Sequence, residues 1–174
     1  EQKTAIDFAL DAFVNKKKRF VIIEAGTGVG KSAIGYTIAK YMVDKHQPSP
    51  EYESSAYYLT TQKILQQQYM KDFASTGMLS LKSSSNYRCQ YYKIKTCQEA
   101  RRELKATDDD RFKAACASGC HYVKEKTKCI SGYHGVTNFP YFLTEINHSG
   151  HLPNRQVMVI DECHNTELEL SKFV

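Results

Sequence analysis

The chain reads Phe-Val-Ile-Ile at residues 20–23 and Glu-Ala-Gly-Thr-Gly-Val-Gly-Lys-Ser at residues 24–32. An apolar run, a glycine-rich loop ending in Lys-Ser and a helical pattern after it are typical of a phosphate-binding loop. Glycines tolerate positive φ, so successive backbone N–H groups can curl around a phosphate at the positive N-terminus of the helix. The predicted nucleotide-binding residues of this loop are Gly26, Thr27, Gly28, Val29 and Gly30.

Lys31 and Ser32 close the loop and are expected to supply its chemistry. Lys31 would reach the β and γ phosphates as a catalytic residue, and the Ser32 hydroxyl would ligate Mg²⁺. Ala25 stands where the usual pattern has its first glycine, and this departure favours helicase-type loops over kinases or small GTPases. The loop therefore predicts a site for ATP with Mg²⁺.

A second motif follows the apolar run Val-Met-Val-Ile at residues 157–160, where two carboxylates stand side by side. At the carboxyl end of a parallel strand beside a phosphate-binding loop, Asp161 would hold Mg²⁺. Glu162 would orient and deprotonate the attacking water as the second catalytic carboxylate. This pairing predicts nucleotide hydrolysis and not phosphoryl transfer to a substrate.

The composition limits the class of protein. With 174 residues, of which 41% are hydrophobic, the chain can bury one core, and one domain with an insertion is the natural expectation. No apolar run approaches the roughly 20 residues that cross a membrane, and no signal peptide opens the chain. We expect an intracellular protein without a membrane partner, cytoplasmic in a bacterium or phage and nuclear in a eukaryote.

Helical and strand patterns alternate along the chain. Helices are expected at 2–15, 31–46, 63–73 and 140–147, and strands at 20–23, 56–59, 135–138 and 157–161. This alternation predicts an α/β fold of the RecA-like, phosphate-binding-loop type, with a mostly parallel sheet and helices on both faces. The predicted domain boundaries are 1–81 for the first part of the motor domain, 82–130 for an insertion and 131–174 for the remainder.

The insertion carries the positive charge of the chain. Residues 82–129 contain twelve Lys and Arg against six Asp and Glu, whereas the other 126 residues contain twelve against thirteen. Tyrosines lie among these basic residues, a mixture that suits phosphate neutralisation and base stacking. A solvated basic surface is the alternative interpretation.

Five of the six cysteines also lie in the insertion, at 89, 97, 116, 120 and 129. Disulfides are disfavoured because the nucleotide-binding motifs indicate an intracellular protein and the cysteine number in the insertion is odd. Four thiolates converging on one centre suit either structural zinc or an iron–sulfur cluster, and the spacing leaves both open. Cys163, beside the acidic motif, is expected to be a packing residue.

The motifs together resemble one known family. The segments 24–32, 81–89 and 159–165, with a cysteine-rich stretch between the second and third, are similar to the superfamily 2 iron–sulfur helicases of the XPD and DinG type. The resemblance implies a small, mainly helical insertion that holds a [4Fe–4S] cluster. It assigns the ligands, by order, to Cys89, Cys97, Cys116 and Cys120, with Cys129 as an alternative to Cys97.

The same resemblance implies an activity. The chain would be part of an ATP-dependent DNA helicase, a monomeric motor moving 5′ to 3′ on single-stranded DNA and opening forked duplexes. Gln2 would read adenine, and the segments 60–62 and 66–68 would meet the nucleic-acid backbone. The second motor domain that completes such sites is not in these 174 residues, so we expect the segment alone to hydrolyse ATP poorly.

Three alternatives stay open at this point. The chain could be a nucleic-acid-stimulated ATPase or translocase that does not separate strands. It could also be a zinc-stabilised nucleic-acid-binding module whose nucleotide site is regulatory. RNA is a third possibility for the substrate, because no residue pattern here reads a 2′-hydroxyl.

Overall fold

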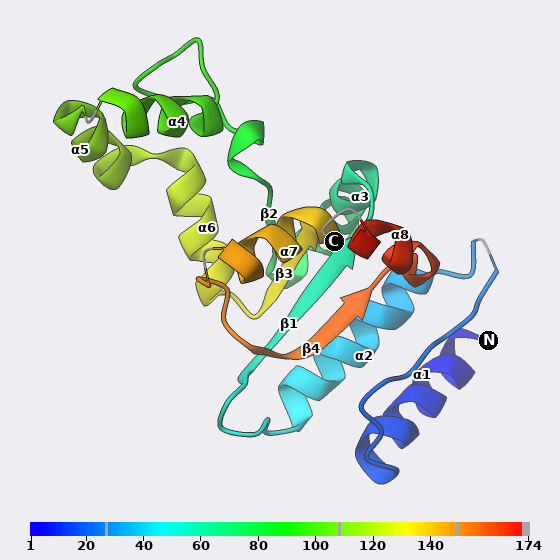
Figure 1. The fold of residues 1–174 in the computed structure, drawn as a ribbon. Helices are drawn as coiled ribbons and strands as arrows, with labels where there is room; N and C mark the ends of the chain where they lie inside the picture. Colours follow the sequence, from blue (N-terminus) through cyan, green and yellow to red (C-terminus); the bar gives the residue numbers. More distant parts are fainter. Residues whose placement is uncertain (27, 108, 149, 172–174) are drawn as a thin grey trace.

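A four-stranded sheet lies at the centre of the molecule. The computed structural model describes residues 1–26, 28–107, 109–148 and 150–171. The strands are β1 (Glu53–Thr60), β2 (Met78–Leu81), β3 (His134–Asn138) and β4 (Arg155–Ile160), in the order β2-β3-β1-β4 (Figure 1). All pairs of these described strands are parallel, which confirms the predicted α/β fold with a parallel sheet.

Helices cover both faces of the sheet because β1 is apolar on both sides. Ala56 and Tyr58 face a core formed with α2 (Lys31–Lys45) and α3 (Lys63–Phe73). Tyr57 and Leu59 point the opposite way, as alternate residues of a strand must, and pack on α7 (Phe139–His148). This burial on both faces is typical of parallel sheets covered by crossover helices.

The register of the strands brings three carboxyl ends to one edge. Leu59 is paired with Ile160 on one side and with Thr137 on the other, and the Asp161 N–H donates to the Leu59 carbonyl oxygen at 2.9 Å. The helix α2 begins at Lys31, directly after the glycine-rich loop, and lies against β4. The two predicted nucleotide motifs therefore meet at this edge.

The prediction of a strand at 20–23 is wrong. The chain is extended there, but residues 20–25 are paired with no strand in the described part of the chain. Val21 and Ile23 pack against Ile34 and Ile38 of α2, while Phe20 and Ile22 are exposed. Strand pairing requires an adjacent strand, and β4, the nearest edge of the sheet, is bonded only to β1 (Figure 1).

Other boundaries differ less. The predicted N-terminal helix is α1 (Gln2–Leu10), continued by a π-helical turn at Asp11–Asn15. The short strand β2 was not predicted, because four residues reading Met-Leu-Ser-Leu carry too little alternation to separate them from a loop. Single 3-10 turns lie at Ala74–Thr76, Ser84–Asn86 and Cys163–Asn165, and α8 (Thr166–Ser171) ends the described chain.

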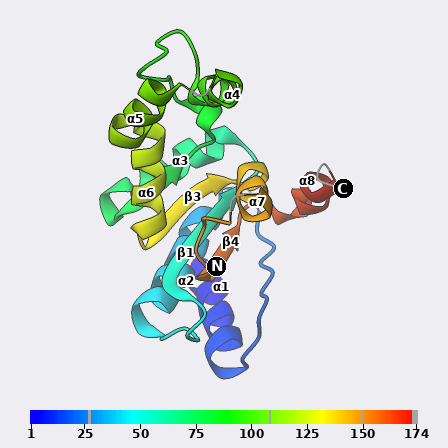
Figure 2. The ribbon, with the colours of Figure 1, turned by 60° about the vertical axis from the view of Figure 1, so that its left-hand side comes forward.

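Three helices lie between β2 and β3, at the end of the molecule away from α1: α4 (Cys97–Thr107), α5 (Asp110–Gly119) and α6 (His121–Ser131) (Figures 1 and 2). They share a small core of their own around Phe112, Ala100 and Tyr122. In the described ranges, no helix is both long and apolar enough to cross a membrane.

Buried polar contacts join α6 to the sheet. The Arg155 guanidinium, at the start of β4, donates to the carbonyl oxygen of Ala56 at 2.9 Å and to that of Ile130 at 3.2 Å. It also donates to the Cys129 carbonyl oxygen and lies over the Tyr57 ring, 4.3 Å from its centroid. Arg155 thus caps the last turn of α6 while it is anchored on β1.

Candidate nucleotide site and cysteine-lined cavity

The glycine-rich loop has the backbone conformation that its sequence predicted. Gly28 and Gly30 have φ of 81° and 82°, in the left-handed region that favours glycine. A Cβ added at Gly30 would lie 2.6 Å from the Gln2 side-chain nitrogen, the end of a flexible side chain that can move aside, so it is the positive φ that favours glycine here. Gly26 and Val29 belong to the same loop, and Thr27 lies outside the described residues.

Lys31 and Ser32 begin α2 and face the end of β4. The Lys31 ammonium donates to the carbonyl oxygens of Ala25 at 3.3 Å and Gly26 at 3.5 Å. The Ser32 hydroxyl donates to the Asp161 carboxylate at 3.1 Å, although the two residues are 129 positions apart in sequence. A hydroxyl and a carboxylate oxygen are the ligands that Mg²⁺ prefers, so the donor set fits this ion.

Glu162 follows the predicted magnesium ligand in a strained backbone conformation. Its φ is 54°, which is uncommon for a residue with a side chain, and its N–H donates to the Asp161 carboxylate at 3.0 Å. The Glu162 carboxylate lies 3.4 Å from His164 Nδ1. The turn directs Asp161 toward Ser32 and Glu162 toward His164, so the two carboxylates can take different roles.

Gln2 folds onto the phosphate loop. Its side-chain amide donates to the Val29 carbonyl oxygen at 2.6 Å, across 27 positions of sequence. The residue that the resemblance assigned to adenine thus lies at the rim of the predicted nucleotide site.

Two polar residues of the predicted nucleic-acid motif are buried, which corrects that expectation. Gln66 and Thr60 are both 0% exposed, and the Thr60 hydroxyl donates to the Gln62 carbonyl oxygen at 3.2 Å. The Gln66 amide donates to main-chain carbonyls of β2 and β3. Neither side chain can reach a nucleic-acid backbone, whereas Gln67 and Gln68 are exposed.

Comparison with known proteins agrees with this geometry. A family model described as the type III restriction enzyme, res subunit (ResIII), matches residues 1–172. The chain belongs to the ResIII family. It is therefore an ATP-dependent motor domain of the superfamily 2 helicase type, and its enzyme class is an NTPase. No curated protein and no solved structure matches the chain.

The helical segment of this ResIII domain contains a cavity of about 270 Å³. Four of the five insertion cysteines line it, namely Cys89, Cys97, Cys116 and Cys120. The sulfur atoms of Cys97 and Cys120 are 4.0 Å apart, and burial raises the pKa of the Cys97 thiol to about 12. Within the described ranges, no three His, Cys, Asp or Glu residues are arranged to hold a single metal ion.

Cys129 lies elsewhere. It is buried between Leu81 and Tyr141, and burial raises the pKa of its thiol to about 11. Its sulfur lies 2.8 Å from where a Cβ on Gly135 of β3 would stand, so its side chain faces the sheet and does not line the cavity. The structure brings together the four cysteines assigned by order and leaves the alternative ligand out.

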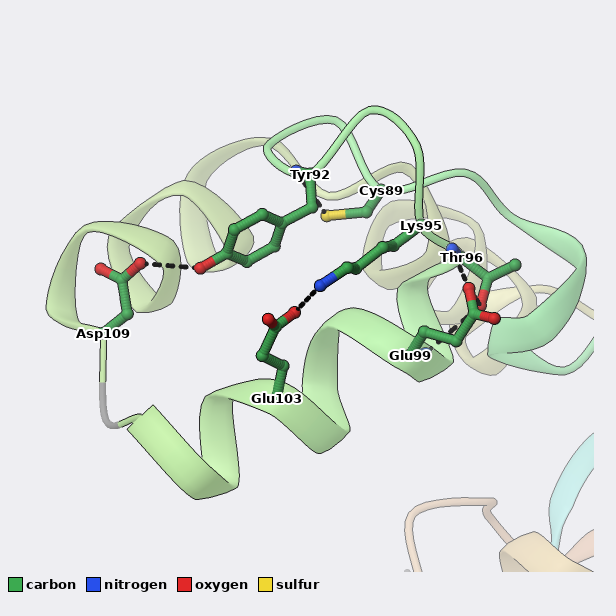
Figure 3. A network of polar contacts seen from close by, with 7 residues as sticks. All are labelled: Cys89, Tyr92, Lys95, Thr96, Glu99, Glu103 and Asp109. Atoms are coloured by element: carbon green, nitrogen blue, oxygen red, sulfur yellow. Dashed lines mark hydrogen bonds and ion pairs between the residues drawn. The ribbon is translucent and has the colours of Figure 1, made fainter.

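The loop from Cys89 to Thr96 is closed by a network of contacts (Figure 3). The Tyr92 N–H donates to the Cys89 sulfur at 3.3 Å, and the Tyr92 hydroxyl donates to the Asp109 carboxylate at 3.0 Å. Lys95 forms an ion pair with Glu103 of α4. The Cys89 N–H also donates to the Lys95 carbonyl oxygen at 2.9 Å, so the two ends of the loop are joined.

Arg101 also lines the cavity, although no sequence motif predicted a role for it. It lines the cavity from α4, and its guanidinium lies 4.8 Å from the centroid of the Tyr122 ring. Its positive charge lowers the pKa of Cys116, opposing the larger effect of burial, which raises it. One arginine among twelve basic residues carries no sequence signal, and only its position beside the thiols distinguishes it.

Proposed function

We propose that this ResIII domain is the nucleotide-hydrolysing motor of a DNA helicase. The observation that carries the proposal is the hydrogen bond between Ser32 and Asp161, 3.1 Å long. It joins the start of α2 to the end of β4 and brings two oxygen ligands for Mg²⁺ next to the phosphate loop.

Each residue of the site then has a distinct role. The loop N–H groups and Lys31 bind the phosphates, and Ser32 and Asp161 would hold Mg²⁺, which neutralises phosphate charge when bound. Glu162 orients the attacking water and accepts its proton. Gln2, at the rim of the loop, is positioned to contact the base.

Equilibrium binding of a fluorescent ATP analogue tests this assignment. We expect Lys31→Ala to lose nucleotide affinity, and Asp161→Asn to lose only the part of the affinity that depends on Mg²⁺. Glu162→Gln should bind nucleotide normally but show slower single-turnover hydrolysis. If Lys31→Ala leaves the affinity for the ATP analogue unchanged, this site is not the nucleotide site.

The nucleic-acid partner is proposed to be single-stranded DNA, with 5′ to 3′ movement implied by the iron–sulfur helicase resemblance alone. The net charge of residues 82–129 is +6, and exposed basic residues of the insertion are available for phosphates: Arg88, Lys93, Arg102, Lys105 and Arg111. Fluorescence anisotropy with DNA and RNA oligonucleotides tests the partner. Strand displacement on forked DNA distinguishes a helicase from a translocase.

We also propose that the cysteine-lined cavity holds an iron–sulfur cluster. Four thiols that line one cavity of about 270 Å³ support a metal group held by cysteines, and the iron–sulfur helicase resemblance favours a cluster over a single zinc ion. Iron, acid-labile sulfide and zinc should be measured on protein purified without oxygen. Cys97→Ser should lose the metal, and Cys129→Ser should retain it; one zinc per chain without sulfide would refute the cluster.

A further inference from the structure

Tyr69 of α3 has a buried hydroxyl without a conventional partner. The residue is 1% exposed, and its ring contacts those of Tyr58 and Phe73, with centroids 5.6 and 5.7 Å away. The hydroxyl makes no hydrogen bond of normal geometry with any described residue. An unpaired buried hydroxyl costs free energy, so its presence requires an explanation.

The core around Tyr69 includes residues that are close in sequence to the predicted magnesium ligands. Tyr69 packs in the same cluster as Tyr36 of α2 and Val159 of β4. Ser32 lies one helical turn before Tyr36 on α2, and Asp161 follows the end of β4, two residues after Val159. Tyr69 therefore packs on the segments of α2 and β4 that lead to these two oxygen ligands.

The electrostatic surroundings of Tyr69 agree with this position. Burial is the main cause that raises the pKa of Tyr69, and the Asp161 charge raises it further, while the nearby Ser32 hydroxyl opposes the shift. A tyrosine hydroxyl carries a proton that it can donate to a carboxylate. The Asp161 carboxylate already accepts from Ser32 at 3.1 Å and from the Glu162 N–H at 3.0 Å.

We infer that Tyr69 is a positioning residue of the magnesium site, whose hydroxyl donates a further hydrogen bond to the Asp161 carboxylate when nucleotide binds. The inference rests on the proposed nucleotide function. A third donor would hold the carboxylate in one orientation toward the ion, which is how hydrogen bonds around a ligand improve metal binding.

Tyr69→Phe tests the inference, because it removes only the hydroxyl. Affinity for the fluorescent ATP analogue is measured with Mg²⁺ and with EDTA. In Tyr69→Phe, the gain in affinity caused by Mg²⁺ should fall by about tenfold, as expected for a lost hydrogen bond to a charged group. Affinity in EDTA should not change.

Tyr36→Phe is the matched control. Its hydroxyl is also buried and unpaired, and its ring stacks on Phe73 with the two centroids 4.5 Å apart. It should leave the Mg²⁺ dependence unchanged. Thermal unfolding in EDTA should show both variants folded, since removing an unpaired buried hydroxyl is neutral or stabilising.

The possible outcomes distinguish a failure of the positioning role from a failure of the proposed function. If Tyr69→Phe and the unaltered chain gain equally from Mg²⁺, the positioning role is refuted and the proposed function stands. If both phenylalanine variants lose the gain equally, the effect belongs to the core and the positioning role is again refuted. If the unaltered chain binds no nucleotide, the proposed function fails and the inference fails with it.

Discussion

Gln66 donates hydrogen bonds from its buried amide to the carbonyl oxygens of Leu81 at 2.8 Å and Val136 at 3.2 Å. It also donates to the Ser80 hydroxyl at 3.0 Å. One side chain on α3 thus joins the end of β2 to the middle of β3. Its role is structural, although it stands in a run of three glutamines whose other two members are exposed.

Gln66→Leu should therefore lower the free energy of unfolding by about 2 kcal/mol, because carbonyls buried under α3 lose their donor. Chemical denaturation measures this change. The exposed neighbour supplies the control, since Gln67→Leu should alter stability by less than about 0.5 kcal/mol. Equal stability of the two variants would contradict the structural role.

Another single residue, His134, should make the stability of the protein depend on pH. The side chain is buried, its Nδ1 lies 3.0 Å from the Tyr58 hydroxyl, and burial lowers its pKa below 6.5. Lys40 and Arg155 lower the pKa further, while Asp44 opposes them. Because the unfolded chain binds a proton more readily than the folded chain does, stability is lost as the pH falls below the unfolded value of about 6.5.

The measurement is the free energy of unfolding between about pH 7.5 and about pH 5.5. The unaltered chain should lose more stability over this range than His134→Gln, which cannot titrate. Identical pH profiles would show that His134 is not the group responsible.

At the scale of an element, the loop from Cys89 to Thr96 presents exposed residues from a fixed base. Ile94 is 94% exposed, and Lys93 beside it is exposed as well. The contacts of Cys89, Tyr92 and Lys95 hold the loop from within (Figure 3). A loop that is ordered before binding loses little conformational entropy when it meets a partner.

Lys93→Ala should weaken binding of single-stranded DNA and reduce the dependence of affinity on salt by about one unit of slope, as for one lost phosphate contact. Thermal stability should not change. Lys3→Ala, on exposed α1 at the other end of the molecule, should have no effect on the slope. A slope that is equal in all three proteins would place the DNA away from this loop.

At the scale of the whole molecule, three sets of polar contacts join α6 to α7 and to the sheet. The Tyr122 hydroxyl of α6 lies 2.8 Å from that of Tyr141 on α7, and Lys126 forms an ion pair with Glu145. Arg155 binds the carbonyls at the end of α6 from the sheet side. Because Tyr122 also contacts Arg101, the cysteine-lined cavity is connected to the sheet through α6.

Arg155→Lys should loosen this junction. Lysine keeps the charge but cannot donate to three carbonyls in the planar geometry of a guanidinium. We expect a loss of about 2 to 3 kcal/mol in stability, together with faster hydrogen exchange in α6. Arg102→Lys, which is exposed on α4, is the control, and unchanged exchange in α6 would refute the role of Arg155.

The chemistry-bearing residues of the nucleotide site could be predicted from local patterns. Glycines with positive φ before Lys31 and Ser32, and an apolar run before Asp161, each depend on a few neighbouring residues. The alternation of helices and strands likewise predicted the parallel sheet. These features are local because backbone conformation and strand burial leave periodic signals in the sequence.

Contacts between distant segments were decided only by the tertiary structure. The pairing of the segment at 20–23 depends on an adjacent strand, and the burial of Gln66 depends on β2 and β3. The separation of Cys129 from the cavity depends on its packing with Leu81 and Tyr141. No sequence pattern distinguished Tyr69 from other core residues, and only its packing against α2 and β4 does so. The sequence alone determined which residues carry chemistry, and packing over long sequence distances determined which of them meet, because a local pattern holds no information on its eventual neighbours.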